Sequence, residues 1–367
     1  MGTAIIILAV VALAFANGAN DNFKGVATLA GSRTTTQKTA LIWATVATFL
    51  GSLTAIALAS ALANAFAGKG LVPAELAQTQ SYGAAVALAA AATVLIASSL
   101  GMPISTTHSL VGALVGAGLM ANTQINLEKL SSGFAIPLIT SPLIAISAAA
   151  LLLPLIRRIS GSTSISDAEC ICIDTEEPAS ACMMNDMALT TDSAPRITTG
   201  TKQQCDDSAT ASTIRVSTNQ IVDRCHFLSA GMVSYARGLN DTPKIAAILL
   251  ILPSFSGLTG FGIVGLTIAA GGLMFSYRVA QTMSEEITEM TAPQGLLANI
   301  VTAVVVIGAS VRGLPVSTTH VSCGSLIGIG AANGGARWEM ISSILAAWLL
   351  TLPVGALFGA LFISILA

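Results

Sequence analysis

The sequence predicts an all-α integral membrane protein built from two helical repeats of inverted topology, with broken or re-entrant helices that meet near the bilayer midplane. Three observations predict this class: the composition, an internal duplication, and polar motifs set within apolar segments. Of 367 residues, 53% are hydrophobic and 9% are charged, and the mean hydropathy is +0.79. Soluble domains carry about 25% charged residues. The apolar segments approach the roughly 20 residues of a membrane-spanning helix, and they lack the alternating pattern of membrane β-strands.

Two motifs each occur twice in the chain. Residues 101–118 read GMPISTTHSLVGALVGAG, and residues 313–330 read GLPVSTTHVSCGSLIGIG, in one register without a gap. A shorter pair reads NGANDNFKGVATLAG at 17–31 and RGLNDTPKIAAILLI at 237–251. Each half therefore carries an Asn-Asp-x-x-Lys motif followed by a Pro-x-Ser-Thr-Thr-His motif, which indicates duplication.

Each half is predicted to cross the membrane five times. In the first half, residues 1–156, the expected segments are 3–16, 40–66, 82–100, 104–120 and 134–156, with the first span broken by the motif at 17–24. In the second half, residues 221–367, a less apolar entry at 221–236 precedes the motif at 237–244 and segments at 254–275, 294–311, 315–330 and 340–366. An odd number of crossings makes the two repeats enter the membrane from opposite sides, as in many secondary transporters.

Residues 157–220 form a polar stretch that joins the halves. It is rich in Ser, Thr, Asp and Glu and has few large apolar residues, so we expect a disordered linker, with a regulatory or phosphorylatable segment as the alternative. The Lys and Arg bias places this stretch on the cytoplasmic side of a membrane that we expect to be the plasma (cytoplasmic) membrane. Four of the six cysteines lie in the stretch and no CxxC occurs, which indicates reduced, unpaired thiols.

The orientation rests on the distribution of basic residues between the two sides. The cytoplasmic side would carry Arg33, Lys38, Arg157, Arg158, Arg278 and Arg337. The opposite side would carry Lys69, Lys129 and Arg312.

The first motif places ionisable residues inside apolar segments. Asp21 and Lys24 recur as Asp241 and Lys244. Charge within a membrane is costly, so such residues are candidates for function. An ion pair that only fastens a broken helix is the alternative, but the same order in both halves favours a functional role.

The second motif has the chemistry of an oxyanion site. Proline favours a helix start, Ser and Thr favour the N-cap, and the first turn leaves backbone N–H groups free. Together with the helix dipole, these groups attract an anion. Two such helix starts facing each other near the midplane would hold a tetrahedral oxyanion from both sides. A single copy would carry little weight, because Ser and Thr often bond to their own helix.

A histidine follows each pair of threonines. For His108 and His320 we favour hydrogen bonds that support the hydroxyl motif, over proton coupling or direct substrate contact. A metal site is not expected, because only His226 remains and no Cys or carboxylate pattern completes a ligand set.

With these four motif copies the sequence resembles the inorganic phosphate transporter (PiT) family of secondary carriers. The family's Gly-Ala-Asn-Asp appears at 18–21 and, altered to Gly-Leu-Asn-Asp, at 238–241. The resemblance covers the chain apart from its polar middle, and it implies a homodimeric symporter that moves phosphate with sodium or a proton. It implies phosphate contacts from Ser105, Thr106, Thr107, Ser317, Thr318 and Thr319. It implies phosphate or cation binding by Asn20, Asp21, Asn240 and Asp241.

One departure from the family bears on the coupling ion. The family commonly has Asn-Asp-x-x-Asn, whereas this chain has Lys24 and Lys244 at the last position. An ammonium group would take the place of a sodium ion or bind the anion directly. We therefore expect weaker sodium dependence, with proton coupling or no coupling.

Two other functions stay open on the sequence alone, and a third is not expected. A permease for sulfate or another tetrahedral oxyanion would use the same fold; phosphate is favoured because it can donate a proton to Asp21 or Asp241. An anion channel would need a continuous polar pore. An enzyme is not expected, because the adjacent Ser and His of a helix start do not form a nucleophile–base pair. The sequence implies no cofactor other than a coupling ion and no nucleic-acid partner.

Overall fold

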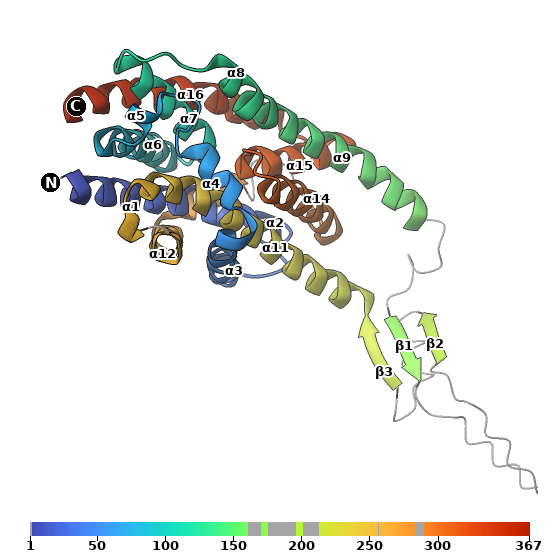
Figure 1. Ribbon diagram of the computed structural model, residues 1–367. Coiled ribbons are helices and arrows are strands. Elements are labelled where there is room, and N and C mark those ends of the chain that lie inside the picture. Colours follow the sequence, from blue (N-terminus) through green and yellow to red (C-terminus); the bar gives the residue numbers. More distant parts are fainter. Residues whose placement is uncertain (1, 161–169, 175–195, 201–212, 256, 284–289) are drawn as a thin grey trace, which may run out of the picture. The chain divides into compact units, whose positions relative to one another are not determined.

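The computed structural model describes residues 2–160, 170–174, 196–200, 213–255, 257–283 and 290–367 (Figure 1). The chain divides into two compact units. The larger unit, here called the membrane unit, comprises Met1–Leu153 and His226–Ala367. The smaller unit comprises Pro154–Cys225.

The first half of the membrane unit is helical throughout its described regular structure. Its elements are α1 (Gly2–Asp21), η1 (Asn22–Gly25), α2 (Ala27–Gly31), α3 (Gln37–Leu58), α4 (Ser60–Phe66), α5 (Ala74–Ala77), α6 (Gln80–Ser99), α7 (Thr106–Met120), α8 (Leu127–Leu130), the π-turn η2 (Ser131–Ala135) and α9 (Ile136–Ser160). The 3-10 turn η1 confirms the predicted break at the first motif. The single span expected at 40–66 is wrong, because the backbone leaves the α conformation at Ala59 (φ −134°, ψ 25°) and α4 then packs against the second half.

The second half repeats the order of long helices. Its elements are α11 (Thr218–Ala246), η3 (Ala247–Ile251), η4 (Pro253–Phe255), α12 (Leu258–Phe275), α13 (Tyr277–Gln281), α14 (Ala292–Val311), α15 (Thr318–Asn333) and α16 (Trp338–Leu366). In contrast to α1, α11 continues through its Asn-Asp motif, and the 3-10 turn follows only after Ala246. The entry segment is itself helical, because Ala230, Val233 and Ala236 bury one of its faces.

Seven stretches of the described residues are long and apolar enough to cross a membrane. They are Gly2–Gly25, Gln37–Leu58, Gln80–Ser99, Leu127–Arg157, Leu258–Phe275, Ala292–Val311 and Trp338–Leu366. Two further helices, α7 and α15, have only 15 and 16 residues. The all-α membrane fold is thus confirmed for this unit, while the inverted topology and the count of five crossings per half stay predictions. Both chain ends lie at the same end of the unit in Figure 1.

Each Ser-Thr-Thr-His helix forms a hairpin with the helix before it. α6 packs on α7, and α14 packs on α15. The turns begin at equivalent glycines, Gly101 (φ 72°) and Gly313 (φ 70°), in a conformation that other residues rarely adopt. The two hairpins therefore have one design.

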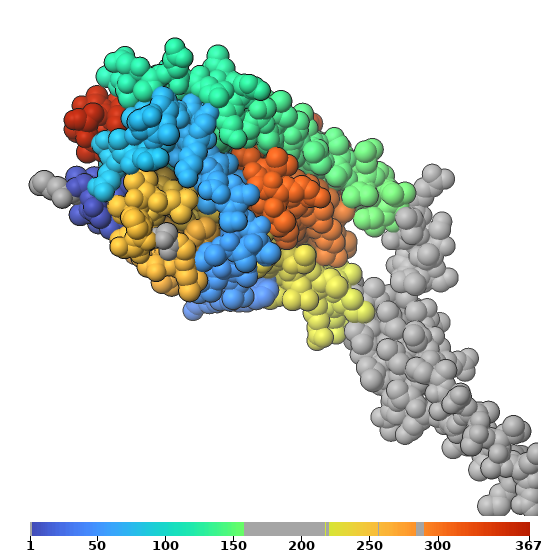
Figure 2. Space-filling view, in the orientation of Figure 1, coloured from blue at the N-terminus to red at the C-terminus, as the bar shows by residue number. Residues whose placement is uncertain are grey.

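The two halves are interleaved in the membrane unit. Helix α1 packs on α12, α3 packs on α12, and α7 packs on α16. Figure 2 shows blue segments of the first half against yellow and orange segments of the second. Glycines allow these close contacts, as small residues do between membrane helices. The site described below draws on both halves for this reason.

The smaller unit contains a three-stranded antiparallel sheet. Its strands are β1 (Cys170–Asp174), β2 (Arg196–Gly200) and β3 (Thr213–Ser217), in the order β2-β1-β3. The expectation of disorder is therefore wrong for these strands, which are rich in Ile, Val and Thr and so favour extended backbone. Within 157–220, residues 157–160 end α9 and residues 218–220 begin α11. The residues outside these helix ends and the three strands, Cys182 and Cys205 included, lie outside the described residues. The boundaries of the linker and its cytoplasmic side stay predictions.

Candidate functional site

Five of the described Asp, Glu, Lys and Arg residues are buried, and all five lie in one polar network. They are Asp21, Lys24, Arg237, Asp241 and Lys244, each at most 4% exposed. Four of them belong to the two Asn-Asp-x-x-Lys motifs, which the sequence analysis selected. A cluster of buried charge inside a membrane unit is the first candidate for function.

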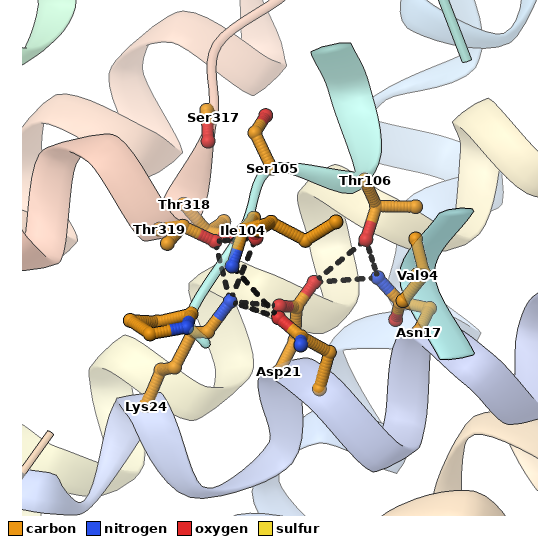
Figure 3. Close-up of polar contacts among 12 residues, drawn as sticks. Asn17, Asp21, Lys24, Val94, Ile104, Ser105, Thr106, Ser317, Thr318 and Thr319 are labelled. Atoms are coloured by element: carbon orange, nitrogen blue, oxygen red, sulfur yellow. Dashed lines mark hydrogen bonds and ion pairs between the residues drawn. The ribbon is translucent and has the colours of Figure 1, made fainter. Parts of the chain in front are cut away.

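Lys24 connects its own motif to both hairpins. Helix α1 ends at Asp21, and the tighter turn η1 brings the ammonium group against the Asp21 carboxylate. The Lys24 Nζ also donates to Asn20 Oδ1 (2.7 Å), the Ile104 carbonyl (2.9 Å) and Thr319 Oγ1 (2.7 Å) (Figure 3). A residue of α1–η1 therefore binds the first hairpin through Ile104 and the second through Thr319.

Lys244 repeats this arrangement from the second half. Its Nζ donates to the Val316 carbonyl (2.6 Å) and to Thr107 Oγ1 (2.7 Å), and it lies 3.4 Å from Asp241 Oδ1. Val316 is the counterpart of Ile104 in the second hairpin. Each lysine thus binds a carbonyl of its own half and the second threonine of the other half.

The second threonine of each Ser-Thr-Thr-His motif also bonds to a carbonyl of the other half. Thr319 Oγ1 donates to the Ile104 carbonyl (2.8 Å), and Thr107 Oγ1 donates to the Val316 carbonyl (3.2 Å). A hydroxyl has one proton to donate and lone pairs to accept with. Each of these hydroxyls uses both functions, since it accepts from a lysine and donates to a carbonyl.

The first threonines hold the carboxylates. Thr106 Oγ1 donates to Asp21 Oδ2 (3.0 Å), and Thr318 Oγ1 lies 3.5 Å from Asp241 Oδ2. Asn17 adds a bond from its Nδ2 to Asp21 Oδ2 (2.7 Å) and a longer one to Asp241 Oδ2 (3.3 Å). The two carboxylates therefore share the Asn17 amide.

The motif serines cap their own helices. Ser105 Oγ accepts from the backbone N–H of His108 (3.1 Å), and Ser317 Oγ accepts from that of His320 (3.2 Å). In Figure 3 neither serine takes part in the dashed contacts around Lys24. The capping part of the sequence argument is confirmed, whereas phosphate contacts from the two serines stay a prediction.

The motif asparagines fasten α1 and α11 to the hairpins. Asn20 Nδ2 donates to Ser98 Oγ (3.0 Å) and to the Met102 carbonyl (3.0 Å). Asn240 Oδ1 accepts from Ser310 Oγ (3.1 Å), the counterpart of Ser98 in the second hairpin. These bonds position the aspartates and lysines that follow each asparagine.

Arg237 is the charged residue of the network that was not among the sequence candidates, and Asn17 was not among them either. The Arg237 NH2 group donates to Asn17 Oδ1 (3.2 Å) and its NH1 group to Asn22 Oδ1 (2.8 Å), while Nε lies 3.7 Å from Asp241 Oδ2. The signal was available, because the offset that aligns the two Asn-Asp motifs pairs Arg237 with Asn17. Identities between the halves select Asn20, Asp21 and Lys24 with their counterparts, whereas Arg237 stands out only as a difference between the halves.

The two histidines pack against each other. Their ring centroids are 4.4 Å apart, and the His320 ring stacks on Trp348 at 3.9 Å. The Trp348 Nε1 donates to the Pro103 carbonyl at the turn of the first hairpin (3.2 Å). No hydrogen bond between described residues joins either imidazole ring to a motif hydroxyl, which differs from the expected supporting role.

Comparisons with known proteins place this geometry in a family context. Residues 17–359 match the model of the phosphate transporter family. The chain is 29% identical to the inorganic phosphate transporter 2-1, chloroplastic, of Arabidopsis thaliana, over 94% of this chain and 69% of that protein. It is 25% identical to a probable low-affinity inorganic phosphate transporter of Bacillus subtilis (strain 168), over 98% and 95% of the two chains. A solved sodium-dependent phosphate transporter has the same fold, with a TM-score of 0.78, 22% identity and 99% of both chains covered.

Proposed function

The chain belongs to the phosphate transporter family, and we propose that its buried network of two lysines and two threonine pairs is the place where phosphate binds. Membership makes the protein an integral membrane protein that carries out secondary transport of inorganic phosphate. The observation that carries the proposal is the exchange of contacts in which Lys24 binds Thr319 and Lys244 binds Thr107. By resemblance, we further propose a homodimer in the plasma membrane.

The network offers phosphate the donors that it needs. Two ammonium groups and the motif hydroxyls supply charge-assisted and neutral hydrogen bonds, and those from ammonium groups are roughly twice as strong as neutral ones. In this conformation the ammonium groups bind the Ile104 and Val316 carbonyls. A phosphate oxygen would replace these carbonyls as acceptor. Because the donors come from both halves, binding would change how the halves hold each other, which couples occupancy to conformation.

The lysines also bear on the coupling ion. Each carboxylate that would bind a cation already lies against an ammonium group, Asp21 against Lys24 and Asp241 against Lys244. We propose that these ammonium groups stand in place of sodium, so that the carrier uses proton coupling or none. Sodium coupling is the alternative, since the solved protein of the same fold is described as sodium-dependent.

Uptake of radiolabelled phosphate into proteoliposomes tests the proposal. We expect saturable uptake that persists without sodium, that a pH gradient either drives or leaves unchanged, and that excess sulfate does not block. Protein-free liposomes provide the background. Absence of phosphate uptake, with sulfate accumulating instead, would overturn the substrate, and a strict sodium requirement would overturn the coupling.

A cavity of the membrane unit lies next to the network. It has a volume of about 480 Å³ and is lined by Ala19, Leu95, Ser98, Ser99, Met274, Phe275, Tyr277 and Arg278. The buried Ser98 accepts from Asn20, whose Oδ1 accepts from Lys24. Two hydrogen bonds therefore separate the cavity wall from the ammonium group. We propose that phosphate enters here, past Arg278, on the side that the sequence predicts to be cytoplasmic.

Chemical labelling of Ser99→Cys tests the route, because Ser99 is an exposed residue of the cavity wall. In a background whose native cysteines are replaced by serine, we expect an anionic methanethiosulfonate reagent to block uptake. Phosphate present during labelling should slow this reaction several-fold. Ser131→Cys, exposed on η2, is the matched control and should be labelled without loss of uptake. Equal effects at both positions would argue against the route.

A further inference from the structure

The buried network carries one positive charge more than it carries negative charges. Lys24, Arg237 and Lys244 are cationic, whereas only Asp21 and Asp241 are anionic. Every other Asp, Glu, Lys or Arg among the described residues that have a burial assignment is exposed or half-buried. The described part of the chain therefore holds no further buried acidic side chain that would balance the network.

The surplus cation, Arg237, lies on α11 beside Asp241 and also interacts electrostatically with Asp21. Asp21 has one close cation, Lys24, but Asp241 faces two, with Lys244 at 3.4 Å and Arg237 at 3.7 Å. The Arg237 Nε is buried and has no hydrogen-bond acceptor within reach. A buried charge without full compensation is costly in a medium of low dielectric constant. An unused donor on the surplus cation is where an anion would lower this cost.

The surplus arises at the one position where the aligned stretches 17–31 and 237–251 differ in charge. Asn17 and Arg237 occupy equivalent places, four residues before Asp21 and Asp241. With asparagine in both places, the network would consist of two matched pairs, Asp21 with Lys24 and Asp241 with Lys244. Arg237 alone makes it positive, and a guanidinium group stays protonated in proteins.

We propose that Arg237 sets the net charge of the bound cargo at −1. The site then takes dihydrogen phosphate alone, or hydrogen phosphate together with one cotransported cation. Sulfate, which carries two charges and no proton, leaves the filled site negative and is disfavoured. This inference rests on the proposed binding of phosphate at the network.

The pH dependence of phosphate affinity in the unaltered protein tests the inference without a substitution. With sodium absent and no pH gradient, we expect the KM for dihydrogen phosphate to stay constant. The KM for total phosphate should then rise by about tenfold per pH unit once the dianion predominates. A KM for total phosphate that stays flat or falls as the pH rises would overturn the inference. Absence of any phosphate uptake would instead overturn the proposed function.

Substitution of Arg237 tests the same point by a second path. Arg237→Asn makes the two halves alike, and we expect the phosphate KM without sodium to rise by about tenfold or more. Arg237→Lys keeps the charge and should retain most of the affinity. Equal KM values for the two variants would show that charge at this position does not matter. If Arg237→Asn fails to fold, the pH series alone decides.

Inhibition by other anions distinguishes selection by net charge from selection by the ability to donate a proton. Perchlorate is a tetrahedral oxyanion with one charge and no proton, so it should inhibit phosphate uptake into proteoliposomes more strongly than sulfate at equal concentration. Arg237→Asn should reduce this preference. Stronger inhibition by sulfate than by perchlorate in the unaltered protein would contradict a site matched to one negative charge.

Discussion

Replacing Lys24 and Lys244 together by asparagine is expected to lower phosphate uptake without sodium by about 100-fold or more. A hydrogen bond to a charged group contributes about 1.5–3 kcal/mol, and each lysine would lose at least one such bond to the anion. The variant also leaves Asp21 and Asp241 without their ammonium partners. Among the described residues, Asp21 then has no cation within 4 Å and Asp241 keeps only Arg237. The freed carboxylates beside asparagine amides are a better site for sodium, so we expect the remaining uptake to become sodium-dependent.

Initial rates with and without a sodium gradient, over a range of phosphate concentrations, measure this effect. Lys38→Asn combined with Lys69→Asn is the matched control, because both side chains are exposed and lie outside the network. This control should transport at the rate of the unaltered protein. If the lysine variant shows the same cation dependence as the unaltered protein, the interpretation of Lys24 and Lys244 as replacements for sodium is wrong.

The duplication allowed much of the network to be predicted from the sequence. The repeat of Asn-Asp-x-x-Lys selected Asn20, Asp21 and Lys24 with their partners, and the structure brings these residues together with the threonines of both hairpins. What the duplication could not reveal was the exchange itself, in which Lys24 reaches Thr319 of the other half. Such a contact depends on how the halves interleave, and a motif does not encode that.

To predict which hydroxyl caps the helix and which faces the network, the start of the helix must be known to within one residue. In the second motif, Ser105 is the N-cap and its hydroxyl serves the backbone of α7, whereas Thr106 and Thr107 begin the helix and point into the network. Capping preferences favour serine and threonine alike. The sequence therefore predicted a helix cap but did not show which of the three hydroxyls would form it.

Two features of the fold were not predicted because no local sequence pattern marks them clearly. The break at Ala59 has neither glycine nor proline to mark it, and it follows from the packing of α4 against the second half. The strands of the smaller unit are five residues long within a polar stretch. Composition averaged over 157–220 indicated disorder, whereas short runs of β-branched residues within it favour strands.

The position of α7, and with it that of Thr106 and Thr107, depends on close contact with α16. At Gly116 a Cβ atom would overlap the Ala356 carbonyl and lie 2.6 Å from the Ala356 Cα. The obstacle is backbone, which cannot rotate away as a side chain would. The contact is close from both sides, since a Cβ at Gly355 of α16 would lie 2.6 Å from the Ser109 carbonyl oxygen of α7.

Gly116→Val is therefore expected to force α7 away from α16 and to abolish uptake. Overpacking typically costs about 1–3 kcal/mol, so we expect the midpoint of thermal unfolding in detergent to fall by roughly 5 °C. Gly262→Ala is the matched control, because a Cβ there meets no atom within 4 Å, and alanine is the better helix former. It should leave both the midpoint and uptake unchanged or slightly raise the midpoint. Full uptake by Gly116→Val would mean that the helix start does not need this contact, and that the threonines are positioned by the network itself.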